Sequence, residues 1–229
     1  MRIGAIQKTS LIEFSGFISC IVFTQGCNFR CHYCHNPELV LPEKFGDTIS
    51  EEEFFDFLEK RKKYLEGVCI TGGEPSIQPD IIDFIEKIKN MGFKVKFDTN
   101  GSNPQIIENL IKGNLIDYIS MDLKGPFEKY EMIAGVKVDT EKIKKSVELI
   151  KNSNVNYEFR TTVVKSQITF DDFEKIGEIL KGAEKFYLQK FVPSKLINPE
   201  FSKENTYTES EFEKIKDIMK NYVKFCDLR

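Results

Sequence analysis

The run Ile18-Ser19-Cys20-Ile21-Val22-Phe23 leads through Thr24-Gln25-Gly26 into Cys27-Asn28-Phe29-Arg30-Cys31-His32-Tyr33-Cys34. The first run is short and mostly apolar, which predicts a buried strand. The second places three thiols in one short loop directly after that strand. Thiolates are the ligands of iron–sulfur clusters, which usually take four of them. Three cysteines from one loop therefore predict a [4Fe–4S] cluster with one iron left open to a small molecule.

Two other metal chemistries compete for the same loop. A structural zinc ion takes four ligands, and His32 or His35 offers the fourth, but zinc ligands usually come as two separate pairs. The run Cys31-His32-Tyr33-Cys34-His35 also matches the covalent haem signature. Haem attachment of that kind suits an exported protein, and we find no export signal in the first residues. The pattern favours the iron–sulfur cluster over both alternatives.

Composition places the chain among ordinary globular proteins. Its 229 residues are 41% hydrophobic and 30% charged, which fits one well-filled α/β domain spanning residues 1–229. The net charge of −3 gives no basic field for nucleic acid. No run approaches the roughly 18 to 20 apolar residues of a membrane helix, so we expect a cytoplasmic protein with reduced thiols. Cys20, Cys69 and Cys226 are isolated, and we expect them to pack as small apolar residues.

Beyond the cysteine loop, apolar runs alternate with amphipathic segments. This alternation predicts parallel strands joined by right-handed helical crossovers, as an open sheet or a partial barrel. Ser50 precedes the first helix as its N-cap, with Glu53 three residues later. Residues 127–138 are expected to be a loop. The expected strands are 18–23, 68–71, 94–98, 117–122, 157–164 and 185–192, and the expected helices are 50–65, 79–91, 104–112, 140–151, 170–180 and 209–222.

Polar motifs follow four successive predicted strands. They are the cysteine loop, Gly72-Gly73-Glu74-Pro75, Asp98-Thr99-Asn100-Gly101 and Asp122-Leu123-Lys124. The carboxyl ends of parallel strands are where α/β proteins bind ligands, so these motifs are expected to form one site. Each of the last three motifs alone is also a common turn sequence.

The residue types suggest what this site binds. The two glycines leave backbone groups open to close approach, and Glu74 adds a carboxylate. Asp98 and Asp122 would repel each other without a counter-charge, and oxygen ligands suit a hard cation. Arg160 is a charge within an apolar strand and needs water or a partner. These residues therefore favour a ligand with charged groups, and a cation beside the aspartates.

Several motifs together resemble a known family. Cys27-x3-Cys31-x2-Cys34, with an aromatic residue before the last cysteine, is similar to the signature of radical S-adenosylmethionine (SAM) enzymes. The following His35-Asn36-Pro37 resembles the enzymes that activate glycyl-radical enzymes. Lys8-Thr9-Ser10-Leu11, Phe23-Thr24-Gln25-Gly26 and Asn36-Pro37-Glu38-Leu39 most resemble the activating proteins of anaerobic ribonucleoside-triphosphate reductase. The resemblance spans the chain and is weakest beyond Arg160.

The resemblance implies a partial (β/α)6 barrel and a radical reaction. The cluster would cleave SAM reductively to a 5′-deoxyadenosyl radical, which would generate a glycyl radical on a partner enzyme. The implied partners are an anaerobic ribonucleotide reductase and an electron donor such as flavodoxin or ferredoxin. No nucleic acid or membrane is implied. The alternatives are a radical SAM enzyme acting on a small molecule, such as a deazapurine-forming relative, and a non-enzymatic metal-binding module.

The resemblance also implies roles for single residues. The cluster ligands would be Cys27, Cys31 and Cys34, and Lys124 would face the cofactor carboxylate or the substrate backbone. Glu74, with Gly72 and Gly73, would hold the methionyl ammonium group. Asp98, Thr99 and Asp122 would hold a monovalent cation. Further cofactor contacts are expected from Tyr33, His35, Asn100, Asp122, Arg160 and Gln189.

The chain departs from the family at two places. It lacks the inserted ferredoxin-like domain of other branches, so a single cluster is expected. It also lacks the Asp-Gly-Pro-Gly element that many activases carry before the first strand, where Glu13-Phe14-Ser15-Gly16 stands instead. We expect this difference to affect how the loop of the partner enzyme is bound at this end of the chain.

Overall fold

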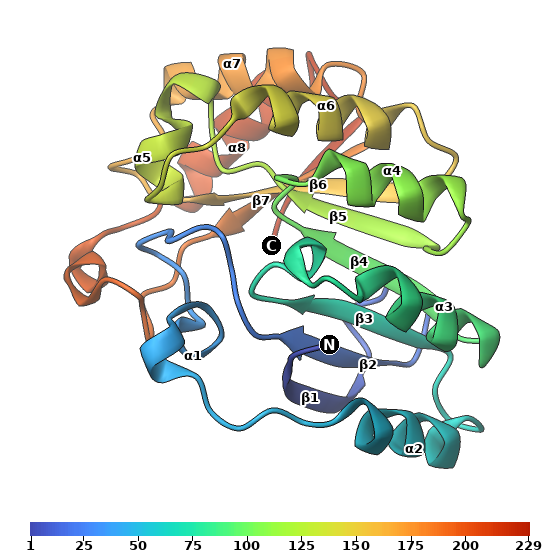
Figure 1. The fold of residues 1–229 in the computed structure, drawn as a ribbon. Coiled ribbons are helices and arrows are strands. Elements are labelled where there is room, and N and C mark those ends of the chain that lie inside the picture. Colours follow the sequence, from blue (N-terminus) through green and yellow to red (C-terminus); the bar gives the residue numbers. More distant parts are fainter. The chain divides into compact units, whose positions relative to one another are not determined.

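The computed structural model describes all 229 residues, which form two compact units (Figure 1). The first contains Met1–Asn28, Asn36–Thr99 and Gln105–Ile119. The second contains Phe29–His35, Asn100–Pro104 and Ser120–Arg229. The boundary passes through the cysteine loop, because Cys27 lies in the first unit and Cys31 and Cys34 lie in the second.

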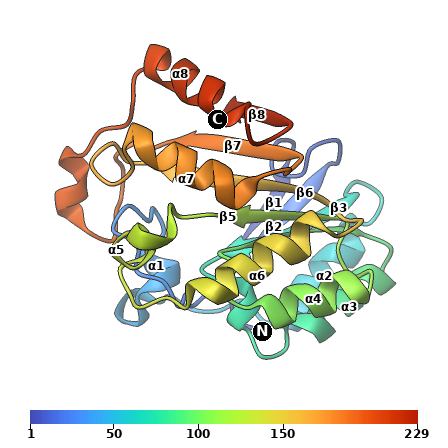
Figure 2. The ribbon, with the colours of Figure 1, turned by 90° about the horizontal axis from the view of Figure 1, so that it is seen from above.

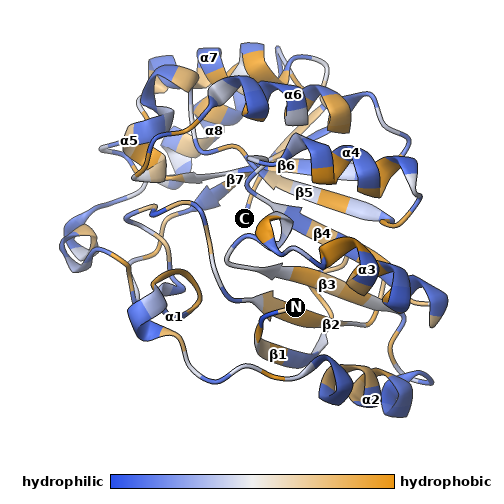
Figure 3. Cartoon of the chain, in the orientation of Figure 1, coloured by the Kyte–Doolittle hydropathy of each residue, from blue (hydrophilic) through white to orange (hydrophobic).

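The first unit is built on four strands in the order β1 (Ile3–Ser10), β2 (Ser19–Thr24), β3 (Gly67–Gly72) and β4 (Lys94–Thr99). β2, β3 and β4 pair in parallel, whereas β1 pairs antiparallel with β2. The side chains of β2 and β3 are largely buried, and these two strands carry much of the hydrophobic colour in Figure 3. The helices of this unit are α1 (Pro37–Val40), α2 (Glu51–Arg61), α3 (Ile81–Asn90) and α4 (Pro104–Lys112).

The second unit contains the parallel strands β6 (Asn156–Val163), β7 (Lys185–Lys190) and β8 (Phe225–Leu228). The short strand β5 (Tyr118–Asp122) begins in the first unit and ends in the second. The helices are α5 (Tyr130–Ala134), α6 (Thr140–Lys151), α7 (Phe170–Leu180) and α8 (Glu209–Met219), which are seen from above in Figure 2. Single 3-10 turns add η1 (Pro42–Lys44), η2 (Pro75–Ile77), η3 (Phe127–Lys129) and η4 (Pro199–Lys203).

The prediction of an α/β fold with mostly parallel strands is confirmed. All six expected strands and all six expected helices are present, with shifts at their ends. The helix expected over 50–65 ends at Arg61, the helix expected over 209–222 ends at Met219, and the strand expected over 185–192 ends at Lys190. Ser50 is the N-cap of α2, and its Oγ accepts the Glu53 N–H at 3.1 Å.

Several elements were not expected from the sequence, among them β1, β8 and α5. β1 and β8 were missed because β1 has mostly half-buried or exposed side chains and β8 has four residues. The prediction that residues 127–138 form a plain loop is wrong, because η3 and α5 fill most of this segment. Tyr130 and Ile133 are fully buried there, so packing and not solvent exposure decides its conformation. No helix is long and apolar enough to cross a membrane.

Candidate active site

The first unit brings Glu74 and Thr99 together at the ends of β3 and β4. Glu74 is almost fully buried, and its Oε1 accepts hydrogen bonds from Thr99 Oγ1 at 2.7 Å and from the Ser76 N–H at 3.0 Å. Burial of a carboxylate requires such donors, because an unsatisfied charge is costly away from water. Two of the residues expected at the site therefore share one hydrogen-bond network.

The glycines before Glu74 allow the backbone to pack tightly on the segment that leads to Cys27. Gly72 has φ of +116°, and a Cβ on Gly73 would lie 2.0 Å from Gly26 O. The Glu74 N–H donates to Gly26 O at 2.8 Å. In this structure the close approach that these glycines allow is to the protein's own backbone, and their contact with a ligand stays a prediction. Their effect is to fix the turn before the first cysteine.

The second unit holds the part of the cysteine loop that contains Cys31 and Cys34. Neither forms a disulfide, and the Cys34 N–H donates to Cys31 O at 2.9 Å in a turn. Burial raises the pKa of the Cys31 thiol, more than the nearby Lys124 ammonium lowers it. Metal ions bind thiolates, so a bound iron would take the place of the thiol proton.

Three backbone hydrogen bonds anchor this loop within the second unit. The Arg30 N–H donates to Ala134 O at 2.8 Å, the Ile197 N–H to Cys34 O at 3.0 Å, and the Asn198 N–H to His32 O at 3.1 Å. The His32 ring also lies edge-on to Phe201, with 5.1 Å between the ring centroids. The loop is thus held by residues from two distant parts of the chain.

An ion triad lies at the end of β5. Asp122 accepts from Arg160 Nε at 2.9 Å and from Lys124 Nζ at 3.2 Å. Burial alone would raise the pKa of Asp122, but Arg160 and Lys124 outweigh that effect and lower it to about 2. Burial would lower the pKa of Lys124, but Asp122 raises it well above its usual value. All three groups are therefore charged at neutral pH. From the sequence we expected Arg160 to need water or a partner, and Asp122 is that partner.

Tyr33 lies beside this triad. Lys124 Nζ is 5.9 Å from the centroid of the Tyr33 ring. The Tyr33 hydroxyl is buried without a hydrogen-bond partner in the protein, and burial raises its pKa well above the usual value. Buried hydroxyls nearly always have a partner, so this oxygen is a candidate contact for a bound molecule.

The remaining expected residues are less directly connected. Gln189 Oε1 lies 3.5 Å from Thr162 Oγ1, and the Asn100 Oδ1 accepts the Ser102 N–H at 2.9 Å, as in an ordinary turn. The His35 ring lies 6.1 Å from the Phe191 ring, and burial lowers the pKa of His35. These contacts are compatible with structural roles.

Two residues near the site had not been singled out from the sequence. Tyr130 is fully buried, its hydroxyl accepts the Lys124 N–H at 3.3 Å, and its ring lies edge-on to Phe29. Lys96, in β4, lies 2.9 Å from Asp98. A lysine between Val95 and Phe97 of an expected strand was the available signal for Lys96. The sequence offered no comparable signal for Tyr130, because its role depends on a contact between separate elements.

The argument for a cation between the aspartates fails in this structure. It assumed carboxylates without a counter-charge, but Asp98 is paired with Lys96, and Asp122 is paired with Lys124 and Arg160. Protein ammonium and guanidinium groups thus provide the positive charge that a bound ion was expected to provide. The charge argument therefore no longer supports a monovalent cation, and we do not assign one to Asp98, Thr99 and Asp122.

The donor set does fit an iron–sulfur cluster and an amino-acid-like cofactor. Cys27, Cys31 and Cys34 follow β2 and form no disulfide, and three thiols are one fewer than the usual four ligands of a cluster. The buried carboxylate of Glu74 suits an ammonium group, whereas Lys124 and Arg160 suit a carboxylate.

The Radical SAM superfamily matches residues 21–180, and the chain belongs to that superfamily. It is 37% identical to a Methanocaldococcus jannaschii protein described as a "putative glycyl-radical enzyme activating enzyme", over 96% of this chain and 92% of that protein. It is 34% identical to the pyruvate formate-lyase-activating enzyme of Clostridium pasteurianum, over 54% of this chain and 52% of that protein.

The fold is shared with solved structures. QueE from Escherichia coli has a TM-score of 0.57 at 15% identity, covering 100% of this chain and 93% of that chain. At this identity the likeness concerns the fold alone. The family match over residues 21–180 shows that the chain is a radical SAM enzyme, as the resemblance of its motifs implied.

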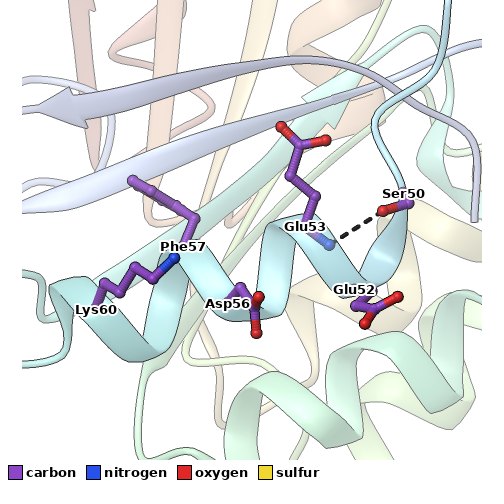
Figure 4. Close-up of a pocket in the computed structure, with 6 residues that line it drawn as sticks. All are labelled: Ser50, Glu52, Glu53, Asp56, Phe57 and Lys60. Carbon is purple, nitrogen blue, oxygen red and sulfur yellow. Dashed lines mark hydrogen bonds between the residues drawn. The ribbon is translucent and has the colours of Figure 1, made fainter.

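A surface hollow lies away from the expected site residues. It measures about 490 Å³ and is lined by residues of α2 and its N-cap: Ser50, Glu52, Glu53, Asp56, Phe57 and Lys60 (Figure 4). Its polar side chains are largely exposed, and nothing in it points to a ligand. We assign it no function.

Replacement of Gly135 is expected to disturb the cysteine loop. Gly135 ends α5 with φ of +69°, and a Cβ there would lie 2.4 Å from Arg30 O, next to Cys31. Gly135→Ala should therefore reduce the iron and sulfide bound per chain after anaerobic reconstitution. Gly182→Ala is the matched control, because Gly182 has φ of +82° with open space around it. Equal iron content in the two variants would contradict the expectation.

Loss of the Asp122 carboxylate should destabilise the apoprotein in a pH-dependent way. Asp122→Asn leaves Lys124 and Arg160 without the charge between them and should lower the free energy of unfolding by about 1–3 kcal/mol at neutral pH. The folded-state pKa is lowered to about 2, so the stabilisation exists above the unfolded pKa of about 3.9 and fades as pH falls toward 2. Urea unfolding at several pH values should show the two proteins converging in acid. A difference in unfolding free energy that does not change with pH would show that the Asp122 charge is not its cause.

Proposed function

We propose that this protein activates a glycyl-radical enzyme, and that its partner is an anaerobic ribonucleoside-triphosphate reductase. The observation that carries the activase class is the 37% identity, over 96% of the chain, to a protein described as a "putative glycyl-radical enzyme activating enzyme". The choice of reductase rests on the motifs at 8–11, 23–26 and 36–39. The electron donor would be a flavodoxin or ferredoxin. We take residues 1–229 as one radical SAM domain.

When bound, the [4Fe–4S] cluster and SAM supply one-electron chemistry that yields a 5′-deoxyadenosyl radical able to take a hydrogen atom from a glycine Cα. Cys27, Cys31 and Cys34 would hold the cluster and leave one iron free for the cofactor. The tight turn at Gly73 and the hydrogen bonds around Cys31 and Cys34 hold these ligands in place. Pre-ordered ligands lose little conformational entropy on binding.

The charged residues would orient the cofactor. Glu74 would accept hydrogen bonds from the methionyl ammonium group, and Lys124 and Arg160 would attract the carboxylate. Asp122 holds both cations in fixed positions, because it accepts a hydrogen bond from each. The unpartnered Tyr33 hydroxyl would complete a polar contact with the bound molecule. No residue in this set needs to act as an acid or base, since the hydrogen moves as an atom.

Cys31→Ala should abolish cluster binding and SAM cleavage together. The variant removes one of three ligands from a set that already lacks a fourth. Iron and labile sulfide analysis after anaerobic reconstitution, with 5′-deoxyadenosine measured after reduction, checks both effects. Cys226→Ala is the control, because Cys226 lies in β8, outside the cysteine loop, and should leave both values unchanged. Cleavage that survives in Cys31→Ala would refute the ligand assignment.

The partner is tested by electron paramagnetic resonance. Reduced protein with SAM and anaerobic ribonucleoside-triphosphate reductase should produce the doublet of a glycyl radical. A reductase whose radical glycine is replaced by alanine is the matched control and should give no doublet. A doublet only with another glycyl-radical enzyme, such as pyruvate formate-lyase, would retain the activase class and exclude the reductase. Formation of 5′-deoxyadenosine only with a small metabolite would refute activation altogether.

A further inference from the structure

Lys96 is a buried lysine surrounded by potential cation ligands. It lies in β4, where it pairs in register with Cys69 of β3, and its side chain is 4% exposed. Lys96 Nζ lies 2.9 Å from Asp98 Oδ1, 3.8 Å from Glu13 Oε2 and 3.9 Å from Cys69 Sγ. Ligand atoms of these three neighbours lie within 4.8 Å of one another, as they would around a metal ion. The ammonium group is within reach of all three.

We infer that Lys96 is a tethered cation that replaces a bound monovalent ion at Asp98, so that cofactor binding by this enzyme needs neither potassium nor sodium. The inference rests on the proposed function, in which Glu74 would bind the cofactor, because Asp98 directly precedes Thr99, whose hydroxyl donates to Glu74 at 2.7 Å. An ion from solution must be captured and dehydrated at each binding event, whereas the lysine is always present. Oxygen donors such as Asp98 and Glu13 suit either kind of cation.

The burial of Asp98 explains why a positive charge beside it is required. Asp98 is 6% exposed, and a buried carboxylate without positive charge is costly. Removing one partner of a buried ion pair leaves the other uncompensated. Without the Lys96 ammonium, the space between Asp98, Glu13 and Cys69 should therefore attract a small cation from solution.

Lys96→Met tests this directly. The variant keeps a similar apolar stem and removes the charge. Its apoprotein should melt roughly 2–4 °C higher in potassium or sodium chloride than in tetramethylammonium chloride of equal ionic strength. Its affinity for SAM, measured by calorimetry on the cluster-loaded protein, should be roughly tenfold higher in the small-cation salts. The unchanged protein should show no difference between the salts in either measurement.

Lys89→Met is the matched control. Lys89 is paired with Asp117 at 2.7 Å in the same unit, on a half-buried surface that is accessible to solvent. Its loss should lower stability equally in all three salts. A potassium or sodium response in this control would show that the effect is not specific to Asp98 and would overturn the inference.

A double variant covers the case in which Lys96→Met does not fold. Lys96→Met with Asp98→Asn removes both charges and should fold and show no salt response. A cation requirement in the unchanged protein, a folded Lys96→Met that ignores small cations, or a double variant that is unfolded or still responds would each overturn the inference. Melting of the apoprotein does not involve SAM. Failure of the unchanged protein to bind SAM would therefore count against the proposed function and leave the inference on Lys96 to be decided by melting.

Discussion

The arrangement of the site depends on the need to compensate carboxylates buried at the strand ends. Asp98 is compensated by Lys96, and Asp122 by Lys124 and Arg160. Glu74 accepts hydrogen bonds from the neutral donors Thr99 and Ser76. Because each interaction fixes a side chain on a neighbouring part of the chain, the electrostatic requirement also sets the geometry. The charges remain on protein groups whether or not a ligand is bound.

Backbone packing is the second constraint, and it acts on the loop that carries the cysteines. Gly73 allows contact with Gly26 just before Cys27, and Gly135 allows contact with Arg30 just before Cys31. Each glycine lies far along the chain from the residue it contacts. Side chains larger than hydrogen would displace the backbone of the loop at these points. The thiols are therefore held through main-chain contacts that the cysteine motif itself does not reveal.

The sequence was sufficient to predict the elements that depend on local pattern. Apolar runs marked β2 to β7, and the motifs after them marked where polar groups follow the strands. β1 and β8 lacked such a pattern, since one is half-exposed and the other is very short. The pairing of Asp98 with Lys96 was predictable in principle, because residues two apart on a strand share one face. The contacts of Tyr130 and Gly135 were not, because they join segments that only the tertiary structure brings together.

The local charges also bear on what the site can bind. In the second unit, two cations share one carboxylate, which leaves a positive excess among Lys124, Arg160 and Asp122. In the first unit, Lys96 faces the carboxylates of Asp98 and Glu13. Glu74, which follows the neighbouring strand β3, adds a further carboxylate to this unit. The positive excess of the second unit suits a carboxylate, whereas the buried Glu74 carboxylate of the first unit suits an ammonium group. A ligand with only negative charge, such as a nucleotide phosphate, would match the carboxylates of the first unit poorly. Each unit therefore favours a different charged group for a physical reason independent of the cysteine motif.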